Sequence, residues 1–192
     1  MSEKIRLEAP LTKEGNGSLK SGHIVLLCGV LYAARDAAHA RMKEAIECGS
    51  DLPFDPDGQI VYFTGPAPAR PGHAIGPAGP TTASRMDPYS PLLIERGLKG
   101  MVGKGVRSEA VLESMKKHGC VYFGAIEGTA ALLADRVKEA EVVAYEDLGA
   151  EAVRRLVVED FPVMVVNDLH GGDLYREGRE RWRRRARKGG SL

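Results

Sequence analysis

The stretch from Gly65 to Pro80 constrains this chain more than any other, because it holds five prolines and four glycines. Such a composition excludes a helix interior and a central strand. A loop of this length in a compact domain is usually either functional or disordered. We interpret it as functional because it leads into Thr81, Thr82 and Arg85, which supply two hydroxyls and a guanidinium. Together with backbone N–H groups, these suit a carboxylate or a phosphate.

Short apolar segments alternate with segments of helical spacing on both sides of this loop. This alternation, with short links, predicts an α/β fold with a mixed, mostly parallel sheet covered by helices. The early Gly- and Pro-rich strands do not fit a purely doubly wound order, so we also expect a second small sheet. We expect strands at 4–7, 23–29, 59–64, 98–102, 120–126, 141–145 and 161–166, and helices at 36–48, 108–117, 129–138 and from Pro88 or Pro91 to Gly97.

Length and composition indicate an ordinary globular domain. The chain has 192 residues, of which 43% are hydrophobic and 28% charged, with a net charge of +1. No apolar run is long enough for a membrane span, and the first residues lack the apolar core of a secretory signal. We therefore expect a cytoplasmic protein with no membrane or nucleic-acid partner. The three cysteines, Cys28, Cys48 and Cys120, have no metal or cluster spacing and are expected to be small buried residues.

The C-terminal segment differs in charge from the rest of the chain. Between Arg176 and Lys188 there are eight basic and two acidic residues, a net of +6, which leaves about −5 for the remainder. Such a segment is either an arm that docks on an acidic partner or nucleic acid, or a solvated terminal helix. The only tryptophan, Trp182, indicates that it packs somewhere. We predict a domain at 1–175 and a basic tail at 176–192.

Three cations lie on loops that the predicted fold places at strand ends. Arg35 precedes a helix, Arg85 follows the Gly- and Pro-rich loop, and Lys104 lies between two glycines. Ligands of α/β sheets collect at such loops, and cations there suit a small dianion. The hydroxyl of Thr81 or Thr82 could contact a substrate or transfer a proton. Because a threonine hydroxyl is a very weak base, proton transfer would need a neighbouring carboxylate or cation. One of these threonines could instead cap a turn.

Other polar residues have two interpretations each. His39 is expected to be structural, and Asp87 could be a helix N-cap. His170 follows a predicted strand in a Gly-rich loop, where a site or subunit contact and a turn are both open. Asp168, His170 and Asp173 could in principle gather a metal, but acid-rich turns are commoner, and we expect no metal on this chain.

Seven motifs carry a resemblance that none of them would carry alone. They are Arg35-Asp36-Ala37-Ala38-His39, Gly65-Pro66-Ala67-Pro68, Gly76-Pro77-Ala78-Gly79-Pro80-Thr81-Thr82, Arg85-Met86-Asp87, Lys99-Gly100-Met101-Val102-Gly103-Lys104-Gly105, Ala144-Tyr145-Glu146-Asp147-Leu148-Gly149 and Asn167-Asp168-x-His170-Gly171-x-Asp173-Leu174-Tyr175. Together they resemble the β subunit, or C-terminal domain, of class I iron–sulfur fumarate hydratases, roughly from residue 5 to residue 175.

The resemblance implies a swivelling β/β/α domain and the reversible hydration of fumarate to L-malate, a step of the tricarboxylic acid cycle. The family uses a [4Fe–4S] cluster as Lewis acid, and the cysteines that hold it lie in an α part that this chain lacks. By resemblance Thr81 matches the family's base, assisted by a carboxylate of the α part. Arg35, Arg85 and Lys104 match its substrate cations, and we add Thr82 to the substrate-binding set. Ala34 departs from the Gly or Thr frequent in relatives.

We therefore expect the β subunit of a heteromeric hydro-lyase that is active only with an α subunit, in an α2β2-type assembly on a small dicarboxylate. An L(+)-tartrate dehydratase β subunit shares the Gly-Pro-Thr-Thr and Gly-Lys-Gly elements. The Gly65-Pro66-Ala67-Pro68 and Met86-Asp87 versions favour fumarase. Mesaconate is a further possible substrate, because a methyl group changes little in a pocket. A non-catalytic assembly or binding module is the alternative of another class.

Overall fold

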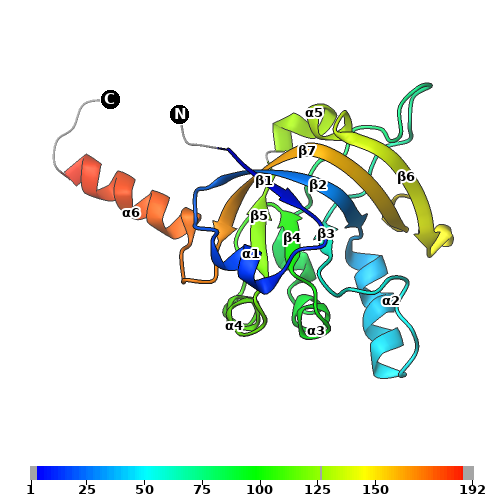
Figure 1. The fold of residues 1–192 in the computed structure, drawn as a ribbon, viewed down its shortest axis with the longest axis horizontal. Coiled ribbons are helices and arrows are strands. Elements are labelled where there is room, and N and C mark those ends of the chain that lie inside the picture. Colours follow the sequence, from blue (N-terminus) through cyan, green and yellow to red (C-terminus); the bar gives the residue numbers. More distant parts are fainter. Residues whose placement is uncertain (1–3, 126, 188–192) are drawn as a thin grey trace.

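The computed structural model describes residues 4–125 and 127–187 (Figure 1). The strands are β1 (Lys4–Glu8), β2 (Ile24–Ala33), β3 (Ile60–Tyr62), β4 (Gly100–Gly103), β5 (Val121–Gly124), β6 (Val137–Ala144) and β7 (Val153–Asn167). The helices are α1 (Lys13–Gly17), α2 (Asp36–Glu47), α3 (Ser90–Glu95), α4 (Glu109–His118), α5 (Ala130–Ala134) and α6 (Leu174–Arg187). Three 3₁₀ turns, η1 (Ala83–Met86), η2 (Glu127–Thr129) and η3 (Glu146–Glu151), complete the described elements.

The seven described strands form one mixed sheet in the order β1-β2-β3-β4-β5-β7-β6. Neighbours from β1 to β5 are parallel, whereas β7 is antiparallel to β5, β6 and β2. Because β7 pairs with both β5 and β2, the sheet closes on itself through β2, β3, β4, β5 and β7. In Figure 1, β2 and β7 arch over the shorter strands, with α2, α3 and α4 on one side and α5 on the other.

Two apolar cores lie on opposite faces of the central strands. Along β3 and the residue after it, Ile60 and Tyr62 belong to one core, while Val61 and Phe63 belong to the other. This alternation follows from the two-residue period of a strand. The first core fills the space inside the closed sheet and contains the apolar residues of β2 and β7, and the second includes apolar residues of α2, α3 and α4. The central strands are therefore buried on both faces.

Most predicted elements are confirmed with small shifts of their ends. Helix α2 matches the prediction to within one residue, and α4 ends at Gly119, whose φ of 76° is left-handed, as a C-terminal glycine should be. The helix predicted to start at Pro88 or Pro91 begins at Ser90. The helix predicted at 129–138 is wrong beyond Ala134, because Val137 and Lys138 belong to β6, which pairs with β7.

Two predictions about the sheet need correction. β7 was predicted only at 161–166 but begins at Val153, and β2 extends to Ala33. Pro162 lies inside β7, in register with Leu26 of β2 but with no residue of β5 or β6, so its missing N–H breaks no bond to those two strands. The predicted second small sheet is part of the same hydrogen-bonded sheet as the other described strands, because β2 and β7 belong to both layers.

Outside the cores, the structure settles further expectations. Cys28 and Cys120 are buried as predicted, but Cys48, at the C-terminus of α2, is exposed. Helix α6 extends away from the body (Figure 1), and Trp182 on it is 57% exposed, so the packing of this segment that the tryptophan indicated is not seen around Trp182 in the described residues. Among the described residues, no helix has the length and apolar character that crossing a membrane requires.

Candidate functional site

The Gly- and Pro-rich loop is fixed to the end of β3 by side-chain and backbone hydrogen bonds. The hydroxyl of Thr64 donates to the carbonyl oxygen of Gly79 at 2.8 Å, and the buried hydroxyl of Tyr62 donates to that of Ala78. The N–H of Thr81 then donates to the carbonyl oxygen of Phe63 at 2.6 Å. A segment that cannot form a strand of its own is thus held in one path by the strand beside it.

Thr81 and Thr82 lie alongside the loop that carries Lys104. The N–H of Lys104 donates to the carbonyl oxygen of Thr81 at 3.2 Å, and the N–H of Ala83 donates to that of Lys104 at 2.8 Å. Gly103 permits this approach, since a Cβ there would lie 2.8 Å from Cδ2 of Phe63 and 3.2 Å from Cβ of Ala83. Within the described part of the chain, the hydroxyls of Thr81 and Thr82 make no hydrogen bond, so neither caps a turn.

The glycine after Lys104 is held from two sides. The hydroxyl of Tyr122 donates to the carbonyl oxygen of Gly105 at 3.1 Å, and the N–H of Gly105 donates to the hydroxyl of Tyr175 at 3.3 Å. Tyr175 belongs to the first turn of α6, so the start of this helix supports the Lys104 loop although the rest of it extends away.

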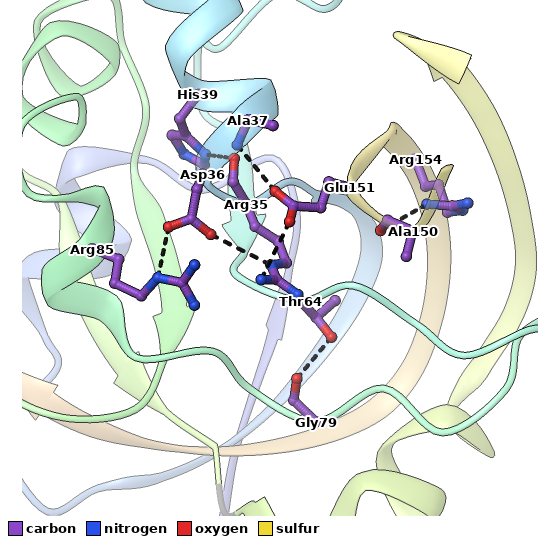
Figure 2. A network of polar contacts seen from close by, with 10 residues as sticks. All are labelled: Arg35, Asp36, Ala37, His39, Thr64, Gly79, Arg85, Ala150, Glu151 and Arg154. Carbon is purple, nitrogen blue, oxygen red and sulfur yellow. Dashed lines mark hydrogen bonds and ion pairs between the residues drawn. The ribbon is translucent and has the colours of Figure 1, made fainter. Parts of the chain in front are cut away.

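A single carboxylate, Asp36, joins Arg35 and Arg85 (Figure 2). Its Oδ1 lies 2.7 Å from Nε of Arg85, and its Oδ2 lies 3.5 Å from Nε of Arg35. Glu151 completes the cluster, because its Oε1 lies 3.3 Å from a terminal nitrogen of Arg35. Its Oε2 accepts the N–H of Ala37 at 3.0 Å, which satisfies one of the unpaired N–H groups of the first turn of α2.

The topology explains why these distant residues meet. Ala33 at the end of β2 is paired with Arg154 near the start of β7, so Arg35 emerges beside Glu151 at the end of η3. Gly65 fits between them, since a Cβ there would lie 3.1 Å from Cδ of Arg35 and 3.1 Å from the carbonyl oxygen of Ala150. Arg85 reaches the same place from η1.

Beneath these loops lies a buried cation, Arg107, whose side chain is 0% exposed. Its Nε lies 2.7 Å from Oδ1 of Asp87, and its Cζ lies 5.3 Å from the centre of the Phe63 ring and 5.2 Å from that of the Tyr122 ring. It also donates to Oγ of Ser90 at 2.7 Å. Asp87 accepts the N–H of Ser108 at 2.8 Å as well, so it caps α4 across space rather than its own helix.

His39 is buried on α2, which agrees with the predicted structural role. Its Nδ1 lies 2.8 Å from the carbonyl oxygen of Arg35, which can only accept, so Nδ1 carries the proton. Nε2 is then a buried acceptor without a partner in the described residues. Burial lowers the pKa of His39 to about 4, despite the bond to the Arg35 carbonyl, and the positive charge of Arg107 acts in the same direction.

The loop that contains Asp168 and His170 is a turn. Asp168 accepts N–H bonds from Ser21 at 2.7 Å, His170 at 2.8 Å and Gly172 at 2.8 Å. Burial alone would raise the pKa of Asp168, but these three donors lower it. His170 uses Nε2 to contact the carbonyl oxygen of Gly17. Among residues 4–125 and 127–187, no group of three His, Cys, Asp or Glu side chains could hold a metal ion.

The candidate site is an open surface rather than an enclosed pocket. The side chain of Arg85 is 50% exposed, that of Arg35 is 24% exposed, and Thr82 is also exposed. A groove of about 420 Å³ lies beyond Gly65, between residues 66–75 and β6, and is lined mostly by small apolar residues such as Ala67 and Ala140. None of the predicted site residues lines this groove.

The structure brings the predicted residues together in two neighbouring groups. Thr81 and Thr82 lie against the Lys104 loop, and Arg35 lies with Arg85 on Asp36. Asp36 and Glu151 were not among the predicted site residues. The position of Asp36 directly after Arg35 was a usable signal, whereas nothing local marks Glu151.

Fold and site together define a class: a mixed α/β domain in which Arg35 and Arg85 meet on one carboxylate at an open surface. The family model described as Fumarase C-terminus matches residues 1–178, and this chain belongs to that family. Fumarate hydratase 2 of Leishmania major is 42% identical over 178 residues, which are 91% of this chain and 31% of that protein. The anaerobic class I fumarate hydratase of Escherichia coli is 42% identical over 153 residues, 79% of this chain and 28% of that protein.

A relative of a different length is also similar. A protein of Methanocaldococcus jannaschii with the provisional name L(+)-tartrate dehydratase subunit beta is 38% identical over 173 residues. The match covers 87% of this chain and 89% of that protein. This chain therefore spans less than a third of the length of the two fumarate hydratases, but nearly all of a relative named as a subunit.

Proposed function

We propose that this chain is the β subunit of a heteromeric class I fumarate hydratase and completes, with an α subunit, a site for the reversible hydration of fumarate to L-malate. The observation that carries the proposal is the meeting of Arg35 and Arg85 on Asp36, beside the Thr81 segment and the Lys104 loop. Arg35 and Arg85 bring two guanidiniums to one place, and guanidiniums are the donors that suit carboxylates best. Family membership supports the reaction class.

The openness of the surface supports a partner. Closing an active site around its substrate strengthens the electrostatic interactions inside it, whereas Arg85 is half exposed here. The described residues also offer no set of ligands for the [4Fe–4S] cluster. The proposal places the cluster on the α subunit, and no step on this chain is derived through it. The swivelling β/β/α character of residues 1–175, the basic tail at 176–192 and an α2β2-type assembly are parts of the same proposal.

In this proposal the chain's own residues bind the substrate and move a proton. Arg35, Arg85 and Lys104 bind the carboxylates, and Thr82 contributes a hydroxyl. In the direction of dehydration, the hydroxyl oxygen of Thr81 accepts the proton lost from the carbon beside one carboxylate. A threonine hydroxyl needs a carboxylate to take that proton onward, which we assign to the α subunit.

The test is a hydratase assay under anaerobic conditions, with the chain alone and with its cluster-loaded α partner, on fumarate, tartrate and mesaconate. Activity only in the mixture, and highest on fumarate, supports the proposal. Activity highest on tartrate indicates an L(+)-tartrate dehydratase β subunit, the function favoured by the subunit-length relative. Activity of the chain alone, or none in any mixture, contradicts the proposal.

Variants of the loop separate catalysis from assembly. Thr81→Ala should lower kcat about 10²- to 10⁴-fold while the α subunit still binds, because a proton-transfer group is lost. Ser84→Ala is the matched control, since it removes an exposed hydroxyl from the adjoining turn η1. Arg85→Ala should raise KM and lower kcat together, because it holds a reacting dianion. Unchanged turnover in Thr81→Ala would favour a non-catalytic assembly module.

A further inference from the structure

The most specific polar geometry outside the predicted residues is at Asp36. Its two carboxylate oxygens are divided between two guanidiniums, with Oδ1 2.7 Å from Nε of Arg85 and Oδ2 3.5 Å from Nε of Arg35. Both contacts use the Nε edge. The terminal nitrogens of Arg85 therefore remain available on a side chain that is 50% exposed. Arg35 is held a second time through Glu151, at 3.3 Å from one terminal nitrogen.

We propose that Asp36 is a positioning residue that sets the separation of the two guanidiniums and thereby selects dicarboxylates by the distance between their carboxylates. The inference rests on the proposed function for its substrate class. A guanidinium binds a carboxylate best through two parallel N–H donors of one edge. By binding Nε of both arginines, Asp36 leaves the two terminal nitrogens of Arg85 and one terminal nitrogen of Arg35 for the carboxylates of a substrate.

The surroundings of Asp36 make it suited to this role. It is the first residue of α2, where a carboxylate is stabilised by the helix dipole, and its side chain is 26% exposed. Glu151 binds the same helix end through the N–H of Ala37 and so fixes Arg35 independently. Arg85 has no second carboxylate of this kind in the described residues, so it depends more on Asp36 than Arg35 does.

A neighbouring ion pair provides a matched control. Arg41 of α2 forms a two-bond pair with Asp147 of η3, one bond at 2.7 Å, and among the described residues neither shares a hydrogen bond or ion pair with Arg35 or Arg85. Asp147→Asn therefore removes one carboxylate between α2 and η3, as Asp36→Asn does at the start of α2, but leaves the two site arginines in place. General effects of lost charge or of a loosened α2 appear in both variants.

The first experiment measures equilibrium binding of malonate, succinate and glutarate to the complex of the full chain with its α partner, by calorimetry. We expect the wild type and Asp147→Asn to prefer one carboxylate spacing. In Asp36→Asn the ratio of the dissociation constants for the best and worst dicarboxylate should fall by about tenfold, the value of one charge-assisted hydrogen bond. An equal change for all three ligands, or no binding by the wild type, overturns the inference.

The second experiment observes the guanidiniums directly in the full chain, through the Nε–H resonances of arginine in NMR spectra. In Asp36→Asn the Nε–H signals of Arg85 and Arg35 should shift and exchange faster with water, that of Arg85 more strongly. In Asp147→Asn only the signal of Arg41 should change. Unchanged signals of Arg85 overturn the inference. Neither experiment depends on turnover. If the complex binds dicarboxylates with a selectivity that depends on Asp36 but hydrates none of them, the proposed function is contradicted and the role of Asp36 is not.

Discussion

The neutral state of His39 predicts a specific loss of stability in acid. The pKa of His39 falls from its ordinary value of 6.5 to about 4 because its ring is buried, with Arg107 adding positive charge nearby, while the Arg35 carbonyl and Asp36 oppose the fall. The unfolded chain therefore binds a proton on this ring at a higher pH than the folded chain does. Stability is fully present above pH 6.5 and is lost progressively as the pH falls from 6.5 toward 4.

The size of the effect follows from the same two values. At about 1.4 kcal/mol per pH unit, the difference between 6.5 and about 4 amounts to about 3 kcal/mol of unfolding free energy. The packing supports a large effect, since the His39 ring lies 5.5 Å from the ring of Phe63 and its Nε2 has no partner among the described residues. A proton on Nε2 would be both buried and unpaired.

The assay is urea unfolding of the wild type and His39→Phe at a series of pH values from 7.5 to 4.5. His39→Phe removes the titrating group and keeps an aromatic ring. At neutral pH its free energy of unfolding should be about 1 kcal/mol lower than that of the wild type, because the hydrogen bond to the Arg35 carbonyl is lost. Its stability should then change little across the window in which the wild type loses most of its 3 kcal/mol, about 1.4 kcal/mol per pH unit. His73→Gln, on an exposed loop, is the control and should follow the wild type. Parallel loss in the wild type and His39→Phe would refute the reasoning.

Two further predictions concern the support of the site. Arg107→Met should lower the free energy of unfolding by about 3–5 kcal/mol in urea, because it leaves the carboxylate of Asp87 without its buried partner; a loss below about 1 kcal/mol contradicts this account. Gly103→Ala should lower stability by about 1–3 kcal/mol, because its Cβ would lie 2.8 Å from the Phe63 ring. Gly178→Ala, with nothing within 4 Å, should be neutral or stabilising in the same thermal or urea assay, and equal effects of the two alanines would contradict the packing argument.

The sequence predicted the elements that carry their own start and stop signals. The ends of α4 follow from Ser108 and Gly119, and α3 starts at Ser90 before a proline. The strand β7 was underestimated because Asp160 and Pro162 resemble a break. In the structure Asp160 has a φ of 50°, and β2 has a register shift in its pairing with β7 next to Leu27. Only the pairing with distant strands makes such a segment a strand.

The same distinction applies to the candidate site. Arg85, Thr81 and Lys104 were found because they lie in unusual local sequence, and the structure places their segments side by side. Glu151 was not found, since its contacts with Arg35 and Ala37 depend on the pairing of β2 with β7. The residues next to Glu151 in the sequence therefore give no sign that its carboxylate contacts Arg35.

The pairing of β2 with β7 also affects how the chain can acquire its structure during synthesis. Ile24 near the N-terminus is paired with Met164, and the closed sheet is incomplete until β7 has left the ribosome. Until then β2 exposes apolar residues such as Leu27 and Leu31, which the finished molecule buries completely. Pairings of such high sequence separation fold slowly and leave aggregation-prone edges during the delay. Until β7, the last described strand, has been translated, the apolar residues of β2 lack their pairing with it.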